Sequence, residues 1–423
     1  MNHFRLQGGE LACEDTPLAV VAAAADTPTY VYSTATLERH YLVFRDALAA
    51  RPEIGTPLIA FALKANSNVA VVRTLARLGA GADTVSEGEI RRALAAGVPG
   101  ERIVFSGVGK TARELAFALD VGVAEINVES EPELDLLARI AAEKGVRATL
   151  AIRVNPEVGA GGHAKISTGH AESKFGVSLS EAARLYVKAA SVASLAPVGV
   201  ACHIGSQIGD LAPLKAAFAT VRGLVERLRR DGLAVERLDL GGGLGAPYFD
   251  QPDPPPPTEY AAVVAEAVRG LDVSLAFEPG RVIAANAGIL LSRVIHVHER
   301  PEGRRLLVLD AAMNDLVRPA MYDAYHDIRP VAPRPGPLRP YDVVGPVCET
   351  GDTFTRDRML PPLQAGDLVA FMSAGAYGAS MSSEYNTRPL AAEVLVKGAE
   401  FAVIRPRPSY EEMLGRERMP QWL

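Results

Sequence analysis

Between residues 58 and 281, short β-type runs alternate with Ala- and Leu-rich stretches whose apolar residues recur three and four positions apart. This alternation is typical of parallel strands joined by helices. The strand candidates number eight: LIAFAL (58–63), ADTVS (82–86), RIVFS (102–106), EINVE (125–129), ATLAIRV (148–154), VGVACHI (198–204), RLDLG (237–241) and SLAFE (274–278). Eight units predict an α/β fold with a closed (β/α)8 barrel of the TIM type, and an open doubly wound sheet is the alternative.

The sequence pattern changes after Arg281. Strand-like segments separated by Pro and Gly turns follow: ILLSRVIHVHER, RRLLVLDAA, YDVVGPVCE, DLVAFMSAG and AAEVLVKG. They predict a second, mostly antiparallel β domain, a barrel or a sandwich. The first residues, through TYVYS (29–33), also look strand-like and lie outside the eightfold count. We therefore expect a barrel domain over residues 34–283, and a β domain built from residues 1–33 with 284–423 that completes the active site.

Composition excludes several classes of protein. The 44 basic and 50 acidic residues are mixed, and no Lys/Arg run suggests a nucleic-acid surface. The longest Ala/Val-rich run, Leu18 to Asp26, is too short to span a bilayer and lacks the pattern of a signal peptide. Cys13, Cys202 and Cys348 are too widely spaced for a disulfide framework or a metal cluster. These features predict a reduced cytoplasmic protein without a metal.

The strand ends hold the candidate chemistry, because the active site of such a barrel lies at the C-terminal ends of its strands. Lys64 ends the first strand, and GGGLG (241–245) and EPGR (278–281) close the seventh and eighth. The other polar residues at strand ends are Asp83 and Ser86 on the second strand, and His203, Ser206 and Gln207 on the sixth.

A lysine, a glycine run and a carboxylate at one rim predict pyridoxal phosphate as cofactor. The loops after strands seven and eight of such barrels often bind phosphate, and glycines let backbone N–H groups approach an anion. A desolvated lysine can form a Schiff base, so Lys64 would take the aldehyde while Glu278 faced the ring nitrogen. His203 would stack on the ring. Taken singly, the same features also fit a solvated loop lysine, a tight turn and a core histidine.

Several segments together resemble one known family, the diaminopimelate decarboxylases. These are fold-type III pyridoxal-phosphate enzymes of the alanine racemase and ornithine decarboxylase group. The resemblance covers nearly the whole chain. No single segment is specific for the family, but the segments together are. Its carriers are FALKANSN, GADTVSEGE, KISTGHAESKFGV, CHIGSQI, LDLGGGLG, FEPGR, LDAAMNDLVRPAMYDAYH, DVVGPVCETGD and MSAGAYGASMSSEYNTRP.

The resemblance implies decarboxylation of meso-2,6-diaminopimelate to L-lysine and carbon dioxide, the last step of lysine biosynthesis. Lys64 would bind the cofactor aldehyde, His203 would stack on its ring and Glu278 would pair with its ring nitrogen. Catalytic roles fall on Lys64, His203 and Cys348. The full set of implied cofactor-binding residues is Lys64, Asp83, His203, Ser206, Gly242, Gly243, Glu278, Gly280, Arg281 and Tyr377.

The resemblance also implies a pocket for a substrate that carries an amino-acid group at each end. Arg281, Arg318 and Tyr322 would bind the distal carboxylate, and Glu349 the distal ammonium. Tyr377 would contact both cofactor and substrate. In the family the Cys-Glu pair comes from the partner subunit, so Cys348 would act as proton donor within a homodimer. Charges of both signs suit a second amino-acid head, and Arg suits a planar carboxylate. Read alone, Arg318 fits a surface arginine and Cys348 a small buried hydrophobe.

Other functions stay open. The chain could decarboxylate ornithine, lysine, arginine or a carrier-bound glutamyl group, although Arg318 argues against the ornithine type. A racemase is disfavoured by Glu278, and a non-catalytic homologue by the presence of both Lys64 and Cys348. Three features depart from the family pattern: Ala312 in DAAMN, the segment GHAKISTG, and a proline-rich loop around Pro256.

Overall fold

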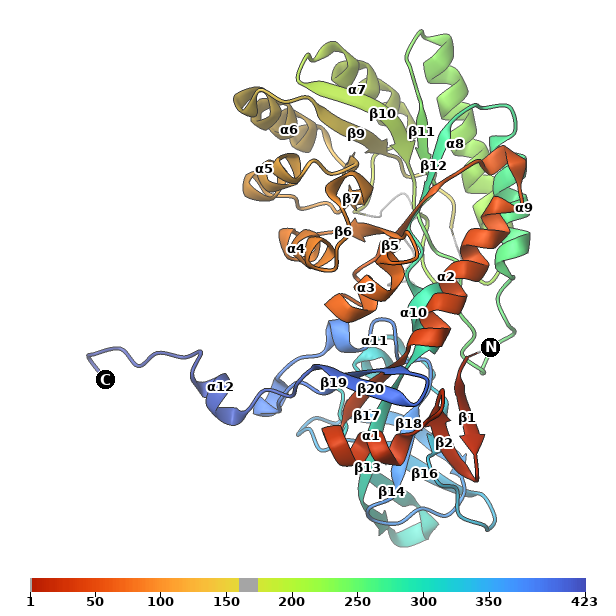
Figure 1. Ribbon diagram of the computed structural model, residues 1–423, viewed down its shortest axis with the longest axis vertical. Coiled ribbons are helices and arrows are strands. Elements are labelled where there is room, and N and C mark those ends of the chain that lie inside the picture. The colour runs from red at the N-terminus through yellow and green to blue at the C-terminus, as the bar shows by residue number, and fades with distance from the viewer. Residues whose placement is uncertain (1, 160–173) are drawn as a thin grey trace. The chain divides into compact units, whose positions relative to one another are not determined.

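The structure is a computed structural model that describes residues 2–159 and 174–423. The chain divides into two compact units (Figure 1). One unit, here called the barrel unit, comprises Glu38–Pro247 and Pro252–Ile283. The other, the β unit, comprises Met1–Leu37, Tyr248–Gln251 and Ala284–Leu423.

The barrel unit contains a closed barrel of eight parallel strands, as the alternation of the sequence predicts. The closing pair joins the eighth strand to the first, with Ala276 opposite Leu58 and Phe277 opposite Ile59. This pairing excludes the open doubly wound sheet. The strands are β5 (Leu58–Ala62), β6 (Gly81–Thr84), β7 (Ile103–Phe105), β8 (Glu125–Val128), β9 (Ala148–Arg153), β10 (Leu195–Ala201), β11 (Arg237–Asp239) and β12 (Ser274–Phe277).

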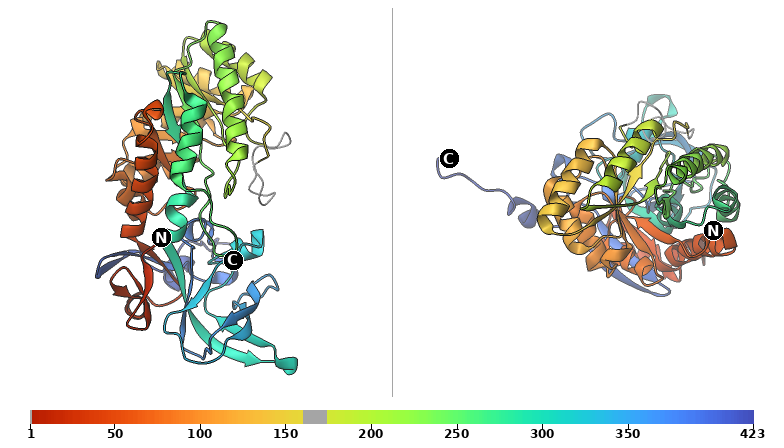
Figure 2. Two further views of the ribbon diagram at one scale, coloured as in Figure 1. Left: turned by 90° about the vertical axis from the view of Figure 1, so that its right-hand side faces the viewer. Right: turned by 90° about the horizontal axis from the view of Figure 1, so that it is seen from above.

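Helices surround these strands, as Figure 2 shows from above. Several begin at a Ser, Thr or Asn whose side chain accepts a backbone N–H of the first turn; Thr111 makes a full capping box with Glu114. Six of the helices match the apolar periodicity of the sequence, whereas the sequence did not predict α2, α7 and α10. The helices are α2 (Thr34–Ala49), α3 (Val69–Ala76), α4 (Glu87–Ala95), α5 (Ala112–Val121), α6 (Glu131–Lys144), α7 (Leu179–Ser191), α8 (Ala212–Arg230), α9 (Pro257–Val268) and α10 (Arg281–Ala284).

The β unit is built on a nine-stranded, mostly antiparallel sheet. Only the pairs β14–β16 and β4–β19 are parallel among the described strand pairs of this sheet. Three of the strands, β15, β17 and β20, were not expected from the sequence. The nine are β4 (Thr29–Ser33), β13 (Gly288–Glu299), β14 (Arg305–Leu309), β15 (Ile328–Pro330), β16 (Arg339–Val344), β17 (Thr353–Leu360), β18 (Leu368–Phe371), β19 (Ala392–Lys397) and β20 (Glu400–Arg405).

The first 33 residues are not wholly strand-like. They form a small sheet of β1 (Phe4–Gln7), β2 (Glu10–Cys13) and β3 (Thr16–Pro17), followed by a helix, α1 (Leu18–Ala25), and then β4. The expectation of strands throughout was wrong at α1, because its Ala-rich composition favours a helix. Two further short helices, α11 (Arg318–Tyr322) and α12 (Tyr410–Leu414), complete the β unit.

Strand β13 organises the β unit. Along its length it pairs with β4, β18 and β14, all antiparallel. Ile289 and Leu291 of β13 are fully buried and pack with Val31, Met372 and Val394 in one apolar cluster. The cluster therefore depends on side chains that a single long strand places in register with its neighbours.

We expect Leu291→Ala to reduce the free energy of unfolding by about 2–5 kcal/mol, because it removes a fully buried side chain and leaves a cavity. Chemical denaturation followed by circular dichroism would measure the loss. Ile295→Ala on the same strand is the matched control, since Ile295 is 45% exposed, and should change stability by no more than about 0.5 kcal/mol. Equal effects of the two variants would contradict the role given to β13.

Candidate active site

Lys64 lies immediately after β5, and its Nζ is 2.5 Å from Oδ2 of Asp83 on β6. Asp83 is fully buried, and its Oδ1 has no hydrogen-bond partner among the described residues. Backbone bonds fix this corner: Leu63 N–H donates to the carbonyl of Asp83, and Ala62 N–H donates to that of Pro279. The ends of the first, second and eighth barrel strands are therefore tied together around one lysine.

His203 follows β10 and contacts the glycine turn after β11. Its Nδ1 accepts the N–H of Gly242 at 3.2 Å, so the neutral ring carries its proton on Nε2. Burial lowers the pKa of His203 well below its usual value, and the cations Arg153 and Lys64 lower it further. The imidazole is therefore uncharged at neutral pH and held in one orientation.

The turn after β11 accepts only glycine at two positions. A Cβ on Gly242 would lie 2.3 Å from the carbonyl oxygen of Glu278. Gly243 has φ +113°, and a Cβ there would lie 2.6 Å from the carbonyl oxygen of Gly205. Gly280 also packs on the chain beside Lys64, less closely, with its would-be Cβ 3.0 Å from Cβ of Ala65. Because these glycines have no side chain, the backbone N–H groups of the turns can approach a ligand closely.

Arg281 and Ser206 bring polar donors to the same strand ends. Arg281 Nε donates to Ser206 Oγ at 3.0 Å, although Arg281 is buried. A buried guanidinium beside a hydroxyl is a suitable pair for an anion such as a phosphate. This contact brings the ends of the sixth and eighth barrel strands together.

Glu278, at the end of β12, lies in a buried polar network that the sequence does not reveal. Its Oε1 accepts from Ser106 Oγ at 3.2 Å and lies 3.4 Å from Nδ2 of Asn127. Burial raises the pKa of Glu278 well above its usual value, and the nearby carboxylates Asp239 and Asp83 raise it further. Asp239 lies in the predicted strand RLDLG, but the sequence did not assign it a role in the site.

In the β unit, Arg318 is a buried cation rather than a surface arginine. Its guanidinium NH1 lies 2.9 Å from Nε2 of His326 and stacks 4.8 Å from the ring centroid of Tyr248. His326 Nδ1 is 2.9 Å from the carbonyl of Met372, so it donates there and leaves Nε2 to accept from Arg318. No pattern in the sequence singled out His326 or Tyr248 as a functional residue. Tyr322, half-buried, ends the short helix that Arg318 begins.

Cys348 and Glu349 lie exposed on a loop of the β unit. The Cys348 N–H donates to Asn386 Oδ1 at 3.0 Å. The neighbouring carboxylate of Glu349, as a hydrogen-bond acceptor and as a charge, raises the pKa of Tyr385. Tyr377 of the same unit is half-buried and has a left-handed φ of +56°.

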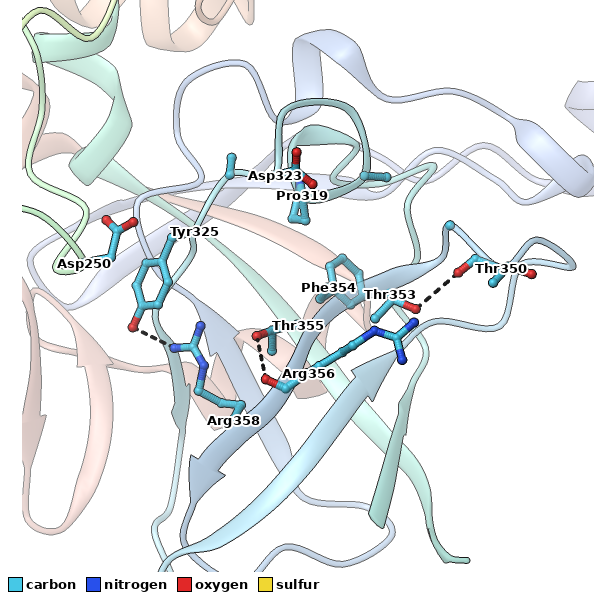
Figure 3. Close-up of a pocket in the computed structure, with 13 residues that line it drawn as sticks. Asp250, Pro319, Asp323, Tyr325, Thr350, Thr353, Phe354, Thr355, Arg356 and Arg358 are labelled. Carbon is cyan, nitrogen blue, oxygen red and sulfur yellow. Dashed lines mark hydrogen bonds between the residues drawn. The ribbon is translucent and has the colours of Figure 1, made fainter. Parts of the chain in front are cut away.

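A pocket of about 520 Å³ in the β unit lies beside this loop and helix α11 (Figure 3). Pro319, from the helix, and Thr350, from the loop, line it, but Arg318, Tyr322, Cys348 and Glu349 do not. Inside it Arg358 donates to the Tyr325 hydroxyl at 2.7 Å. The pocket therefore adjoins the predicted substrate residues without containing them.

Two of the departures from the family pattern have a structural account. Ala312 is fully buried, and its N–H donates to Asp315 Oδ2 at 2.9 Å, so the segment is ordered with alanine in place of glycine. Pro256 is the N-cap residue of α9, where its fixed φ leads into a helix that itself begins with Pro257. The segment GHAKISTG lies outside the described residues.

The structure thus forms two groups of predicted residues. The group in the barrel unit consists of Lys64, Asp83, His203, Ser206, Gly242, Gly243, Glu278, Gly280 and Arg281. The group in the β unit consists of Arg318, Tyr322, Cys348, Glu349 and Tyr377. Across residues 2–159 and 174–423, no three His, Cys, Asp or Glu side chains gather as metal ligands. No helix in that part of the chain is long and apolar enough to cross a bilayer.

Comparison with known proteins identifies the class. Residues 35–285 match the sequence profile of the pyridoxal-dependent decarboxylase family, pyridoxal binding domain. The chain belongs to this family.

Full-length relatives narrow the assignment. The chain is 49% identical to a diaminopimelate decarboxylase of Zymomonas mobilis over 99% of both chains, and 49% identical to that of Pseudomonas aeruginosa over 100% of both. Its fold matches the crystal structure of diaminopimelate decarboxylase from Helicobacter pylori complexed with L-lysine. That match has a TM-score of 0.90 and 40% identity, and covers 94% of this chain and 98% of the other. The chain is therefore a member of the diaminopimelate decarboxylase family, which confirms the resemblance seen in its motifs.

The depressed pKa of His203 predicts a pH effect on stability. The unfolded chain takes up a proton near pH 6.5 that the folded ring resists, so this contribution is present above pH 6.5 and is lost as the pH falls below it. We expect His203→Gln to lessen the decline in unfolding free energy below pH 6.5, by up to about 1.4 kcal/mol per pH unit. Denaturation at several pH values would measure this. His296→Gln, at an exposed histidine, is the control, and an equal change in both variants would contradict the prediction.

Proposed function

We propose that this chain decarboxylates meso-2,6-diaminopimelate to L-lysine and carbon dioxide, with pyridoxal phosphate as cofactor and as a homodimer. One observation carries the proposal: the barrel unit brings Lys64, a glycine turn and the Arg281–Ser206 pair to the ends of neighbouring strands. Membership of the diaminopimelate decarboxylase family supports the substrate. The relatives at 49% identity carry that name over their full length.

The residues present fit pyridoxal phosphate. Lys64 supplies the amine that holds the aldehyde, and the buried Asp83 fixes that amine at 2.5 Å. The phosphate would be bound by a hydroxyl, a guanidinium and the exposed backbone of glycines. These groups belong to Ser206, Arg281, Gly243 and Gly280. Gly242 belongs to the same turn, but its N–H already donates to His203, so its part is to orient the imidazole. Tyr377 adds a further contact to the cofactor.

His203 and Glu278 serve the ring of the cofactor. The uncharged imidazole of His203 can stack on a pyridinium face without charge repulsion, because burial and nearby cations hold its pKa low. Glu278 pairs with the ring nitrogen. The bound cofactor supplies an electron sink for the pair of electrons left when carbon dioxide departs. The protein's task is to orient the reacting carboxylate, exclude water and return a proton to the carbon.

The substrate carries a second amino-acid head, which the β unit and Arg281 recognise. Arg318, with Arg281 and Tyr322, binds the distal carboxylate, and Glu349 binds the distal ammonium. Arg318 is suited to this role because His326 and the Tyr248 ring fix its guanidinium in a buried place. A substrate without a distal carboxylate, such as ornithine, would forgo the charged hydrogen bonds that this carboxylate makes with Arg318.

Cys348 donates the proton to the carbon after decarboxylation, and it reaches the site from the partner subunit together with Glu349. Both residues are exposed on the single chain, which is consistent with a second copy lying over them. A shared active site would make activity depend on dimer formation.

Lys64→Ala should abolish turnover. The assay supplies the purified protein with pyridoxal phosphate, offers meso-diaminopimelate, ornithine, lysine and arginine separately, and quantifies each decarboxylated product by mass spectrometry. Lysine should form from diaminopimelate alone with the parent chain, and not with the variant. Lys215→Ala, at an exposed ion pair with Glu266, should retain full activity. Near-normal turnover by the Lys64 variant would overturn the assignment of the site, and product from ornithine or lysine would overturn the distal pocket.

Arg318→Ala should lower kcat/KM for diaminopimelate about 10- to 100-fold, because one charged hydrogen-bonding partner of the distal carboxylate is lost. Cofactor binding, followed by absorbance, should not change. Arg356→Ala is the matched control, since Arg356 lines the adjoining pocket of the same unit. An unchanged kcat/KM in the Arg318 variant, or an equal loss in both variants, would remove Arg318 from the substrate site.

A further inference from the structure

A buried polar network surrounds Glu278 inside the barrel. Asn127 on β8 donates from Nδ2 to Asp239 Oδ2 at 3.1 Å and to Ser106 Oγ at 3.1 Å, and lies 3.4 Å from Glu278 Oε1. All four side chains are buried, with exposures from 1% for Asp239 to 8% for Glu278. One amide group therefore brings two carboxyls from adjacent strands, β11 and β12, into a single enclosed cluster.

The cations around this cluster are already engaged with other carboxylates. Lys64 pairs with Asp83, Arg237 with Glu125, and Arg153 with Glu129. The charged neighbours of Asp239 and Glu278 include the cation Lys64 and the carboxylates Asp83 and Glu125. Two further negative charges in this enclosed space would repel each other at close range, and like-charge carboxyls in that situation hold one proton between them.

The hydrogen bonds indicate where the shared proton resides. The Gly241 N–H donates to Asp239 Oδ1 at 2.8 Å, which stabilises a negative charge on Asp239. Asn127 Nδ2 lies within hydrogen-bonding distance of one oxygen of each carboxyl, at 3.1 Å from Asp239 and 3.4 Å from Glu278. Burial and the neighbouring charge of Asp239 raise the pKa of Glu278, and burial also raises that of Asp239. The shared proton is therefore placed on Glu278, and the negative charge on Asp239.

We propose that Asp239 and Glu278 act as one proton-sharing carboxyl pair, in which Asp239 is a positioning residue that sets the charge Glu278 presents to the ring nitrogen of the cofactor. This inference rests on the proposed role of Glu278. Beside a bound cofactor whose ring nitrogen carried no proton, Glu278 would be able to give up its own proton: its O–H bond would break as an N–H bond formed, and Glu278 would remain as a carboxylate. The ring would then need no proton from solvent.

The first test uses the full chain freed of cofactor. A carboxyl that keeps its proton in the folded chain lowers stability once the pH exceeds its pKa in the unfolded chain. The folding equilibrium constant then falls about tenfold for each pH unit. We expect Asp239→Asn to reduce this decline between pH 5 and 8, and the double variant with Glu278→Gln to add less than the sum of the two single changes. If Asp239→Asn does not fold, Glu278→Gln alone reports on the same slope. Slopes equal to that of the parent chain would overturn the proposal.

The second test counts protons when pyridoxal phosphate binds, by titration calorimetry at pH 8 in two buffers of different ionisation enthalpy. In Asp239→Asn, the neighbouring charge that helps Glu278 keep its proton is gone, so Glu278 ionises more readily before binding and the ring takes more of its proton from solvent. We expect this variant to take up as much as about one proton more than the parent chain, if a single proton is shared. Asp315→Asn, at a buried carboxyl of the β unit, is the control and should match the parent. Equal counts for Asp239→Asn and the parent would overturn the proposal, whereas no cofactor binding by the parent would overturn the proposed function instead.

Discussion

The pairing of β12 with β5 is the constraint on which the rest of the barrel unit depends. Because all eight strands are parallel, closing the sheet places every strand's C-terminal end on one rim. Lys64, Asp83, His203, the glycine turn and Glu278 come from five different strands, and only closure brings them together. The backbone bonds from Ala62 to Pro279 and from Glu278 to Gly241 continue the ladder beyond the strands. Positioning of the chemistry is thus a property of the sheet rather than of separate loops.

Charge balance is the second organising feature. The barrel unit holds buried ion pairs, such as Arg153–Glu129 and Lys110–Glu133, and each keeps a charge compensated where water is excluded. The Asp239–Glu278 pair adds a negative charge at the end of the barrel where the cofactor is proposed to bind. A cationic cofactor ring would balance this charge.

Much of the barrel could be predicted from the sequence, because eight apolar runs typical of parallel strands leave few alternative folds. The active site of such a barrel lies at the C-terminal ends of the strands, and this selects Lys64, His203 and Glu278. The remainder depends on contacts between distant segments. Asn127 and Asp239 lie within predicted strands, but a strand prediction does not say that their side chains meet. His326 and Tyr248 are 78 positions apart in the chain, yet they enclose the same guanidinium. Helix α1 was missed because an Ala/Val run fits either element when it is short.

The loop that carries Cys348 and Glu349 is held by Asn386 of the same chain, whose Oδ1 accepts the Cys348 N–H. A segment that must become ordered when two copies meet loses conformational entropy at that moment, and the loss weakens binding. In the proposed homodimer, the backbone at Cys348 would already be anchored before the partner arrives. Association would then carry a smaller ordering cost at this residue, and its backbone position in the completed site would be inherited from the monomer.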